Sequence, residues 1–161
     1  MTWGVGRLSL AERGILTMQN TTPLILIVDD DPDMCCNMSD ILDDWGYEVE
    51  TAPEGMTALR MMRRRPYDLV LLDLRMPGPN GLTLSRHMIR LRPETVTMLI
   101  TAYPSDVGPA EARAAGLHHV IAKPVHIPRL LDQIQEALAD SSMLRQQRSA
   151  PAKPLCVESG V

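Results

Sequence analysis

Short aliphatic runs alternate with longer segments of helical spacing along most of the chain. Strands that alternate with helices in this way form βαβ units, so the pattern predicts an α/β fold with a parallel sheet. Five strands are predicted, at residues Leu24 to Val28, Glu48 to Thr51, Leu69 to Asp73, Val96 to Thr101 and His119 to Ala122.

Helices are predicted between these strands from apolar spacing and from Pro and Gly at their ends. The first begins near Pro32, which the first turn of a helix accepts, and ends at Gly46. Three others are predicted from about Glu54 to Arg64, from Gly81 to before Pro93, and from Ile127 to Leu138. On the inward face of the first we place Met34, Met38, Ile41, Leu42 and Trp45.

The helix expected between Pro104 and Gly116 is the weakest of the set. Gly108 and Pro109 lie inside it, and an interior Pro removes a hydrogen-bond donor and clashes with the preceding turn. We therefore expect this helix to be short, kinked or mobile.

The length of 161 residues favours one domain with room for tails. We place that domain at residues 23–140. Residues 1–22 are expected to be a disordered extension, with a possible true start at Met18. Residues 141–161 are polar, contain Pro and lack periodicity, so a disordered tail is expected there.

Charge and cysteine content narrow the class of protein further. A net charge of -4 and a pI near 5.5 argue against binding to nucleic acid or to anionic lipid. No apolar run approaches the roughly 18 residues that a membrane span needs. The three cysteines, an odd number with two adjacent, suggest reduced thiols and a cytoplasmic location.

Polar side chains stand where several of the predicted strands end. Parallel sheets bind ligands outside the carboxyl ends of their strands, so these residues are expected to converge. They are Asp29 and Asp30, Asp73, Thr101 and Lys123.

This set of residues suits phosphoryl chemistry with a divalent cation. Clustered carboxylates without matching His or Cys favour an oxygen-loving cation such as Mg²⁺. A carboxylate can also act as a nucleophile and form an aspartyl phosphate. The neighbouring Asp31 precedes Pro32 and is expected to cap the first helix rather than to bind metal.

Four segments carry a resemblance to a known family: "ILIVDDDP", "DLVLLDLRMPGPNGL", "VTMLITAY" and "VIAKPV". In this order and spacing they resemble the receiver domain of the response regulators of two-component signalling. The resemblance covers about residues 23–140. It implies a doubly wound, CheY-like and flavodoxin-like (βα)5 fold with strand order 2-1-3-4-5, two helices on one face and three on the other.

The resemblance also implies a role for each matching residue. Asp73 would be the phosphoacceptor, Thr101 would donate to a phosphoryl oxygen, and Lys123 would pair with the phosphoryl group. Asp30 would bind Mg²⁺ directly and Asp29 through water, with Asp73 and the backbone carbonyl of Arg75 completing the protein ligands. The bond before Pro124 is expected to be cis. Pro77, Gly78 and Gly81 match the turn that follows the acceptor.

Two features depart from the usual family pattern. Val120 occupies the position three before the motif lysine, where most receivers carry a Tyr or Phe that swings inward on activation. The output surface formed by the fourth helix, fifth strand and fifth helix is therefore in doubt. Arg75 and Tyr103, two residues after Asp73 and Thr101, are both large, and we expect them to cover the phosphoryl group and slow its hydrolysis.

The expected function is that of a stand-alone receiver, not a classical enzyme. A histidine kinase or phosphotransfer protein would supply the phosphoryl group, and an unknown downstream protein would receive the signal from a monomer or weak dimer. One alternative is a binding module that is never phosphorylated. An aspartyl phosphatase is disfavoured because Arg75 stands where a second acid is needed, and a P-loop NTPase because no phosphate-binding motif follows the first strand.

Overall fold

The structure, a computed structural model, describes residues 22–149. It contains five strands and five α-helices in alternating order, with a short 3-10 helix, η2, before α4. The strands are β1 (Leu24–Val28), β2 (Glu48–Ala52), β3 (Leu69–Asp73), β4 (Val96–Thr101) and β5 (His119–Ala122). The helices are α1 (Pro32–Asp44), α2 (Gly55–Arg64), α3 (Gly81–Leu91), η2 (Pro104–Asp106), α4 (Pro109–Ala114) and α5 (Ile127–Ser149).

All five strands form one parallel sheet in the order β2-β1-β3-β4-β5. The predicted fold is therefore confirmed. Every residue of β1, β3 and β4 is buried, because helices cover both faces of the sheet there. This arrangement brings the carboxyl ends of β1, β3 and β4 to one edge of the molecule.

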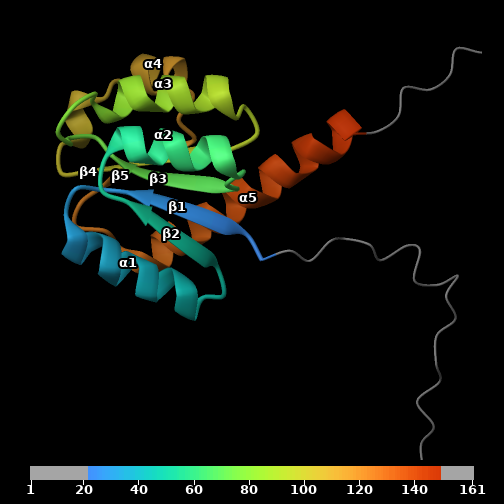
Figure 1. Cartoon of the computed structure of the whole chain (residues 1–161), viewed down its shortest axis with the longest axis horizontal. Coiled ribbons are helices and arrows are strands. Elements are labelled where there is room, and N and C mark those ends of the chain that lie inside the picture. The colour runs from blue at the N-terminus through green and yellow to red at the C-terminus, as the bar shows by residue number, and fades with distance from the viewer. Residues whose placement is uncertain (1–21, 150–161) are drawn as a thin grey trace, which may run out of the picture.

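Helices cover the sheet in two layers, as Figure 1 shows, with α2, α3 and α4 on one face and α1 and α5 on the other. Two groups of buried side chains fill the space between sheet and helices. The α2 side holds Ala58, Leu59 and Met62 against Leu26 and Val70. The α1 and α5 side holds, among others, Cys35, Met38, Leu42, Leu130, Leu131 and Ile134.

The segment from Pro104 to Gly116 contains only short helices, as predicted from its Gly and Pro. Pro109 stands at the first turn of α4, with Gly108 as the N-cap residue, so the ring costs no helical hydrogen bond. The chain before it forms η2 rather than a continuation of α4.

Two expectations differ from the structure. Trp45 does not pack inward: it is 58% exposed, because α1 ends at Asp44 and Trp45 is its C-cap residue. Helix α5 extends to Ser149, where we expected a disordered tail from residue 141. Residues 141–149 contain no Gly or Pro, so a helix once formed can continue through them at little cost. The rest of the tail and residues 1–21 lie outside the described residues.

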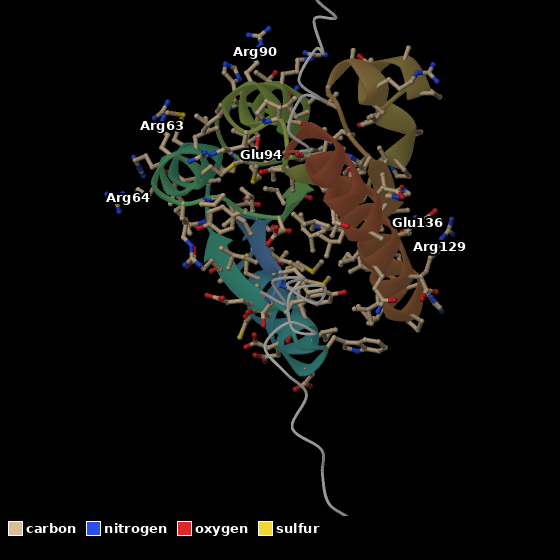
Figure 2. All side chains as sticks on the ribbon, turned by 90° about the vertical axis from the view of Figure 1, so that its right-hand side faces the viewer. Arg63, Arg64, Arg90, Glu94, Arg129 and Glu136 are labelled. Carbon is tan, nitrogen blue, oxygen red and sulfur yellow. The ribbon has the colours of Figure 1, made fainter. Side chains whose placement is uncertain are left out.

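The three arginines at the end of α2 do not act as one patch. Arg65 pairs with Glu48 and Glu50, whereas Arg63 and Arg64 point away from the protein (Figure 2). Basic side chains in the last turn also suit the partial negative charge at the C-terminus of a helix. Within residues 22–149, no helix has the length and apolar character needed to cross a membrane.

Candidate acidic phosphoacceptor site

The strand ends bring together the polar residues that the sequence singled out. Asp29 follows β1 directly, Asp73 ends β3 and Thr101 ends β4, while Lys123 follows β5. Since β1, β3, β4 and β5 are parallel neighbours, these side chains meet at one edge of the sheet. Asp29 and Asp73 are buried there, with 6% and 8% of their surfaces exposed.

The ammonium group of Lys123 bridges the two buried carboxylates. Its Nζ donates to Oδ2 of Asp29 at 3.1 Å and lies 3.1 Å from Oδ1 of Asp73. The side chain of Lys123 is 27% exposed, so the site opens to solvent on this side. One positive charge therefore reduces, but does not cancel, the repulsion between two carboxylates at close range.

A third carboxylate completes an oxygen-rich cluster. One oxygen from each of Asp29, Asp30 and Asp73 lies within 4.8 Å of the others. Asp30, unlike the other two, is exposed. Oxygen-only donors with room for water fit Mg²⁺, which keeps several waters and takes few carboxylates. These residues therefore fit the cation that the sequence predicted.

Asp31, the third acid of "DDD", acts as a helix cap. Its Oδ1 accepts hydrogen bonds from the backbone N–H groups of Asp33 and Met34, at 3.0 and 3.3 Å. This confirms the predicted capping role. Its own N–H donates to Oδ1 of Asp29 at 2.9 Å, so the start of α1 also orients a carboxylate of the site.

The loop after β3 fixes the position of Asp73. The N–H of Arg75 donates to Oδ2 of Asp73 at 2.9 Å, and the N–H of Gly81 donates to the carbonyl of Leu74 at 2.9 Å. A Cβ on Gly81 would lie 2.6 Å from the carbonyl oxygen of Asp73, so only Gly lets α3 begin this close. Gly78 adopts a φ of 93°, which the turn between these residues requires.

Thr101 is buried beside Asp73, since the residue before it, Ile100, pairs with Asp73 in the sheet. Its Oγ1 accepts a hydrogen bond from the N–H of Tyr103 at 3.0 Å. The hydroxyl oxygen is thereby held in place, and the hydroxyl hydrogen remains available as a donor.

Arg75 and Tyr103 lie together above this strand edge. The guanidinium carbon of Arg75 is 3.8 Å from the centre of the Tyr103 ring, which is a close cation–π contact. The same guanidinium pairs with Oδ2 of Asp106 at 2.6 Å. Arg75, Tyr103 and Asp106 therefore form a bridge between the loops that follow β3 and β4.

Burial and charge set the protonation of the pair formed by Asp73 and Lys123. Burial raises the pKa of Asp73 above its ordinary value, and the hydrogen bond from Lys123 offsets this only in part. Burial lowers the pKa of Lys123, but the carboxylates of Asp73 and Asp29 outweigh it, so this pKa lies above its ordinary value. Lys123 is thus charged at neutral pH and is the cation of the site.

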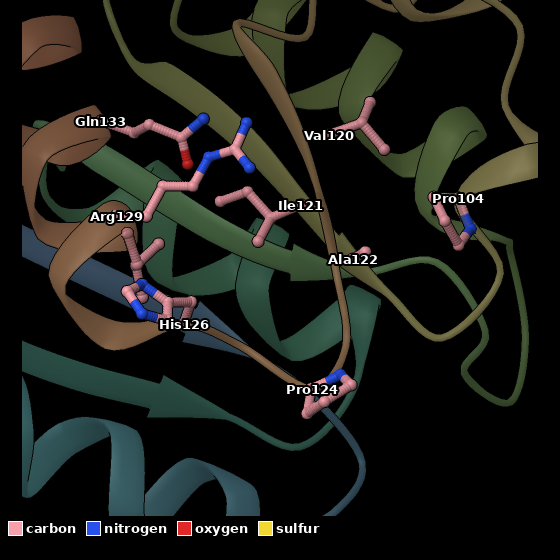
Figure 3. Close-up of a pocket in the computed structure, with 9 residues that line it drawn as sticks. Pro104, Val120, Ile121, Ala122, Pro124, His126, Arg129 and Gln133 are labelled. Atoms are coloured by element: carbon pink, nitrogen blue, oxygen red, sulfur yellow. The ribbon is translucent and has the colours of Figure 1, made fainter.

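Val120 lies near a hollow at the edge of β5 rather than at the acidic cluster. With Pro104, Ile121 and residues at the start of α5 it lines a cavity of about 320 Å³ (Figure 3). The peptide bond between Lys123 and Pro124 is cis, and Pro124 borders the same cavity. No aromatic side chain stands at position 120 to fill this space.

Sequence reasoning did not single out Asp106. Asp106 is 31 residues from Arg75 in an irregular segment, and no motif or periodicity marks it. Cys35 is buried, and its thiol approaches the carbonyl of Asp29 at 3.4 Å. Its packing against the core follows from its place one turn before Met38 on α1.

Comparison with known proteins gives the same assignment as the geometry. The model of the response regulator receiver domain matches residues 25–135. A response regulator receiver protein of Anaeromyxobacter sp. (strain Fw109-5) is 42% identical over 107 residues, which are 66% of this chain and 45% of that protein. The transcriptional regulatory protein ZraR of Salmonella typhimurium is 36% identical over 115 residues, or 71% of this chain and 26% of ZraR.

Solved structures are also similar. A CheY-like receiver domain from Methanospirillum hungatei has a TM-score of 0.71 at 30% identity, covering 76% of this chain and 98% of that one. The response regulator TrrA of Thermotoga maritima, in complex with Mg²⁺ and BeF, has a TM-score of 0.67 at 28% identity, covering 72% of this chain and 99% of TrrA.

The fold and the acidic cluster define a doubly wound α/β domain with an oxygen-rich site at the carboxyl ends of its parallel strands. The chain belongs to the response regulator receiver family of two-component systems. It spans less than half the length of the two curated relatives described above.

Proposed function

We propose that Asp73 accepts a phosphoryl group from a histidine kinase or a phosphotransfer protein, and that the chain then acts on another protein. The observation that carries this proposal is the contact of the Lys123 ammonium with both Asp29 and Asp73, beside an exposed third carboxylate. Membership of the receiver family supports it, as does the complex of TrrA with Mg²⁺ and BeF.

The transfer is an in-line displacement at phosphorus. An Oδ atom of Asp73 attacks, the new O–P bond forms, and the bond from phosphorus to the donor's histidine nitrogen breaks, leaving its electron pair on the imidazole. Lys123 stabilises negative charge on the equatorial oxygens, and Thr101 donates its hydroxyl hydrogen to one of them. Asp29, Asp30, Asp73 and the carbonyl of Arg75 would hold Mg²⁺, which supplies further positive charge at these oxygens.

Incubation with acetyl phosphate tests the proposal without a cognate kinase. Here the bond that breaks joins phosphorus to the acetyl oxygen, and acetate leaves. We expect the intact mass to increase by one phosphoryl group in the presence of Mg²⁺ and to stay unchanged when EDTA removes it. A protein that gains no mass with Mg²⁺ present would instead be a binding module that does not become phosphorylated.

Arg75 and Tyr103 are proposed to protect the aspartyl phosphate from water. Their side chains stack on each other and belong to the residues two positions after the acceptor and after Thr101, from which they can reach over the phosphoryl group. We expect Arg75→Ala and Tyr103→Ala each to speed release of inorganic phosphate, by about 3- to 30-fold for a loss of about 0.7–2 kcal/mol. Phosphate release from purified aspartyl phosphate measures this, and wild-type rates in both variants would refute the shielding role.

A further inference from the structure

The bridge of Arg75, Tyr103 and Asp106 contains a carboxylate to which the chemistry above gives no role. Asp106 pairs with the guanidinium of Arg75 at 2.6 Å, and it is the last residue of η2. Both side chains of this pair are well exposed, at 60% for Arg75 and 44% for Asp106. An ion pair so open to solvent is weak, so a stronger anion nearby can displace its carboxylate.

Backbone hydrogen bonds connect the bridge to Asp73 and Thr101, two of the residues that would contact the phosphoryl group. The N–H of Arg75 is bonded to Asp73, and the N–H of Tyr103 is bonded to the hydroxyl of Thr101. Asp73 and Ile100 pair across β3 and β4, so both loops leave the sheet side by side. The side chain of Arg75 therefore starts two residues from the acceptor, and its flexible stem allows the guanidinium to turn toward it.

We propose that Asp106 is a positioning residue that holds the Arg75 guanidinium off the acceptor, and that phosphorylation makes Arg75 exchange Asp106 for phosphoryl oxygens. This inference rests on the proposed phosphorylation of Asp73. A phosphoryl group carries nearly twice the negative charge of a carboxylate, with oxygens that the planar guanidinium fork matches. It also forms in a more buried place than Asp106, where salt and water screen it less.

The exchange would change the surface formed by α4, β5 and α5, whose role in output is in doubt because Val120 replaces the usual aromatic residue. Asp106 belongs to η2, and Pro104 of the same turn lines the cavity beside Val120 (Figure 3). Release of Asp106 removes the one ion pair that the described residues show between η2 and the loop after β3. Phosphorylation would thus reach this face through an arginine, without a swinging aromatic ring on β5.

Binding of beryllofluoride, a stable mimic of the phosphoryl group, tests the exchange on the full chain saturated with Mg²⁺. We expect Asp106→Asn to bind beryllofluoride about two- to fivefold more tightly, because Arg75 no longer has to leave a partner. Hydrolysis of the aspartyl phosphate is expected to slow by a similar factor, opposite to the effect of Arg75→Ala. The affinity for Mg²⁺ alone is expected to equal that of wild type. A variant in which the acidic cluster itself was disturbed would bind Mg²⁺ with a different affinity.

Two single variants and one double variant serve as controls. Glu111→Gln removes the same charge from the neighbouring helix, where Glu111 accepts from the N–H of Gly108, and it should behave as wild type. Asp106→Glu keeps the negative charge and should restore wild-type affinity. In an Arg75→Ala background, Asp106→Asn should have no effect, because the competing guanidinium is gone. Amide NMR signals of Ser105 and Asp106 should shift on beryllofluoride binding in wild type and not in Arg75→Ala.

The outcomes separate the two proposals. Equal beryllofluoride affinity in wild type and Asp106→Asn, or an equal gain in the Arg75→Ala background, would overturn the exchange and leave phosphorylation of Asp73 intact. Absence of beryllofluoride binding in every variant, together with no phosphoryl gain from acetyl phosphate, would overturn both.

Discussion

An Asp73→Asn protein will gain no phosphoryl group from acetyl phosphate and Mg²⁺, while the wild-type chain gains one. The amide oxygen of Asn is too weak a nucleophile to attack phosphorus. Asn still offers an oxygen to the N–H of Arg75, so the loop after β3 keeps its anchor. Intact-mass spectrometry measures the difference directly.

Asp132→Asn is the matched control, since it makes the same change at an exposed position on α5 and should be phosphorylated at the wild-type rate. A phosphoryl gain in Asp73→Asn equal to wild type would contradict the assignment of the acceptor.

Thermal unfolding shows whether the Asp73→Asn protein is folded. Burial raises the pKa of Asp73, so the folded state binds a proton more tightly than the unfolded chain does. The free energy of unfolding therefore falls as the pH rises from the ordinary pKa of Asp73 through its raised pKa in the folded state. We expect Asp73→Asn, without Mg²⁺, to melt at a higher temperature than wild type at neutral pH, with the advantage shrinking as the pH falls to the ordinary pKa.

Much of the fold follows from local sequence signals because those signals agree with the tertiary structure. β1, β3 and β4 are aliphatic runs buried on both faces, so their predicted bounds match the structure. Asp31 was predicted as a cap from its place before Pro32, a purely local relation. The grouping of Asp29, Asp73 and Lys123 needed only the rule that parallel strands end at one edge.

Three features could not be predicted from local sequence signals alone. The pairing of Arg75 with Asp106 joins two irregular segments, and neither spacing nor composition indicates it. The exposure of Trp45 depends on where α1 ends, since an apolar spacing extended by one residue beyond the helix no longer specifies a face. The continuation of α5 depends on weak helix propensities that add to a helix already stabilised by packing.

Replacement of Lys123 by Met will slow phosphoryl uptake from acetyl phosphate by about 100-fold or more. Removal of one positioned donor from a charge-stabilising site costs about 10²–10³ in rate in comparable sites. Lys123 is the only side-chain cation that the described structure places within 4 Å of both Asp29 and Asp73. Met keeps the length and much of the bulk of the lysine stem, so packing around it is largely preserved. The initial rate of mass gain at saturating Mg²⁺ measures the loss.

Mg²⁺ affinity distinguishes this electrostatic role from a damaged site. Without the ammonium, the carboxylates of Asp29 and Asp73 repel each other and attract a cation more strongly, so Lys123→Met should bind Mg²⁺ more tightly than wild type. Lys123→Arg keeps the charge and should recover part of the rate, whereas Arg129→Met, at an exposed position on α5, should leave both properties unchanged. Slow uptake with tighter Mg²⁺ binding would assign Lys123 to the phosphoryl group rather than to the fold. A wild-type rate in Lys123→Met would remove it from the reaction altogether.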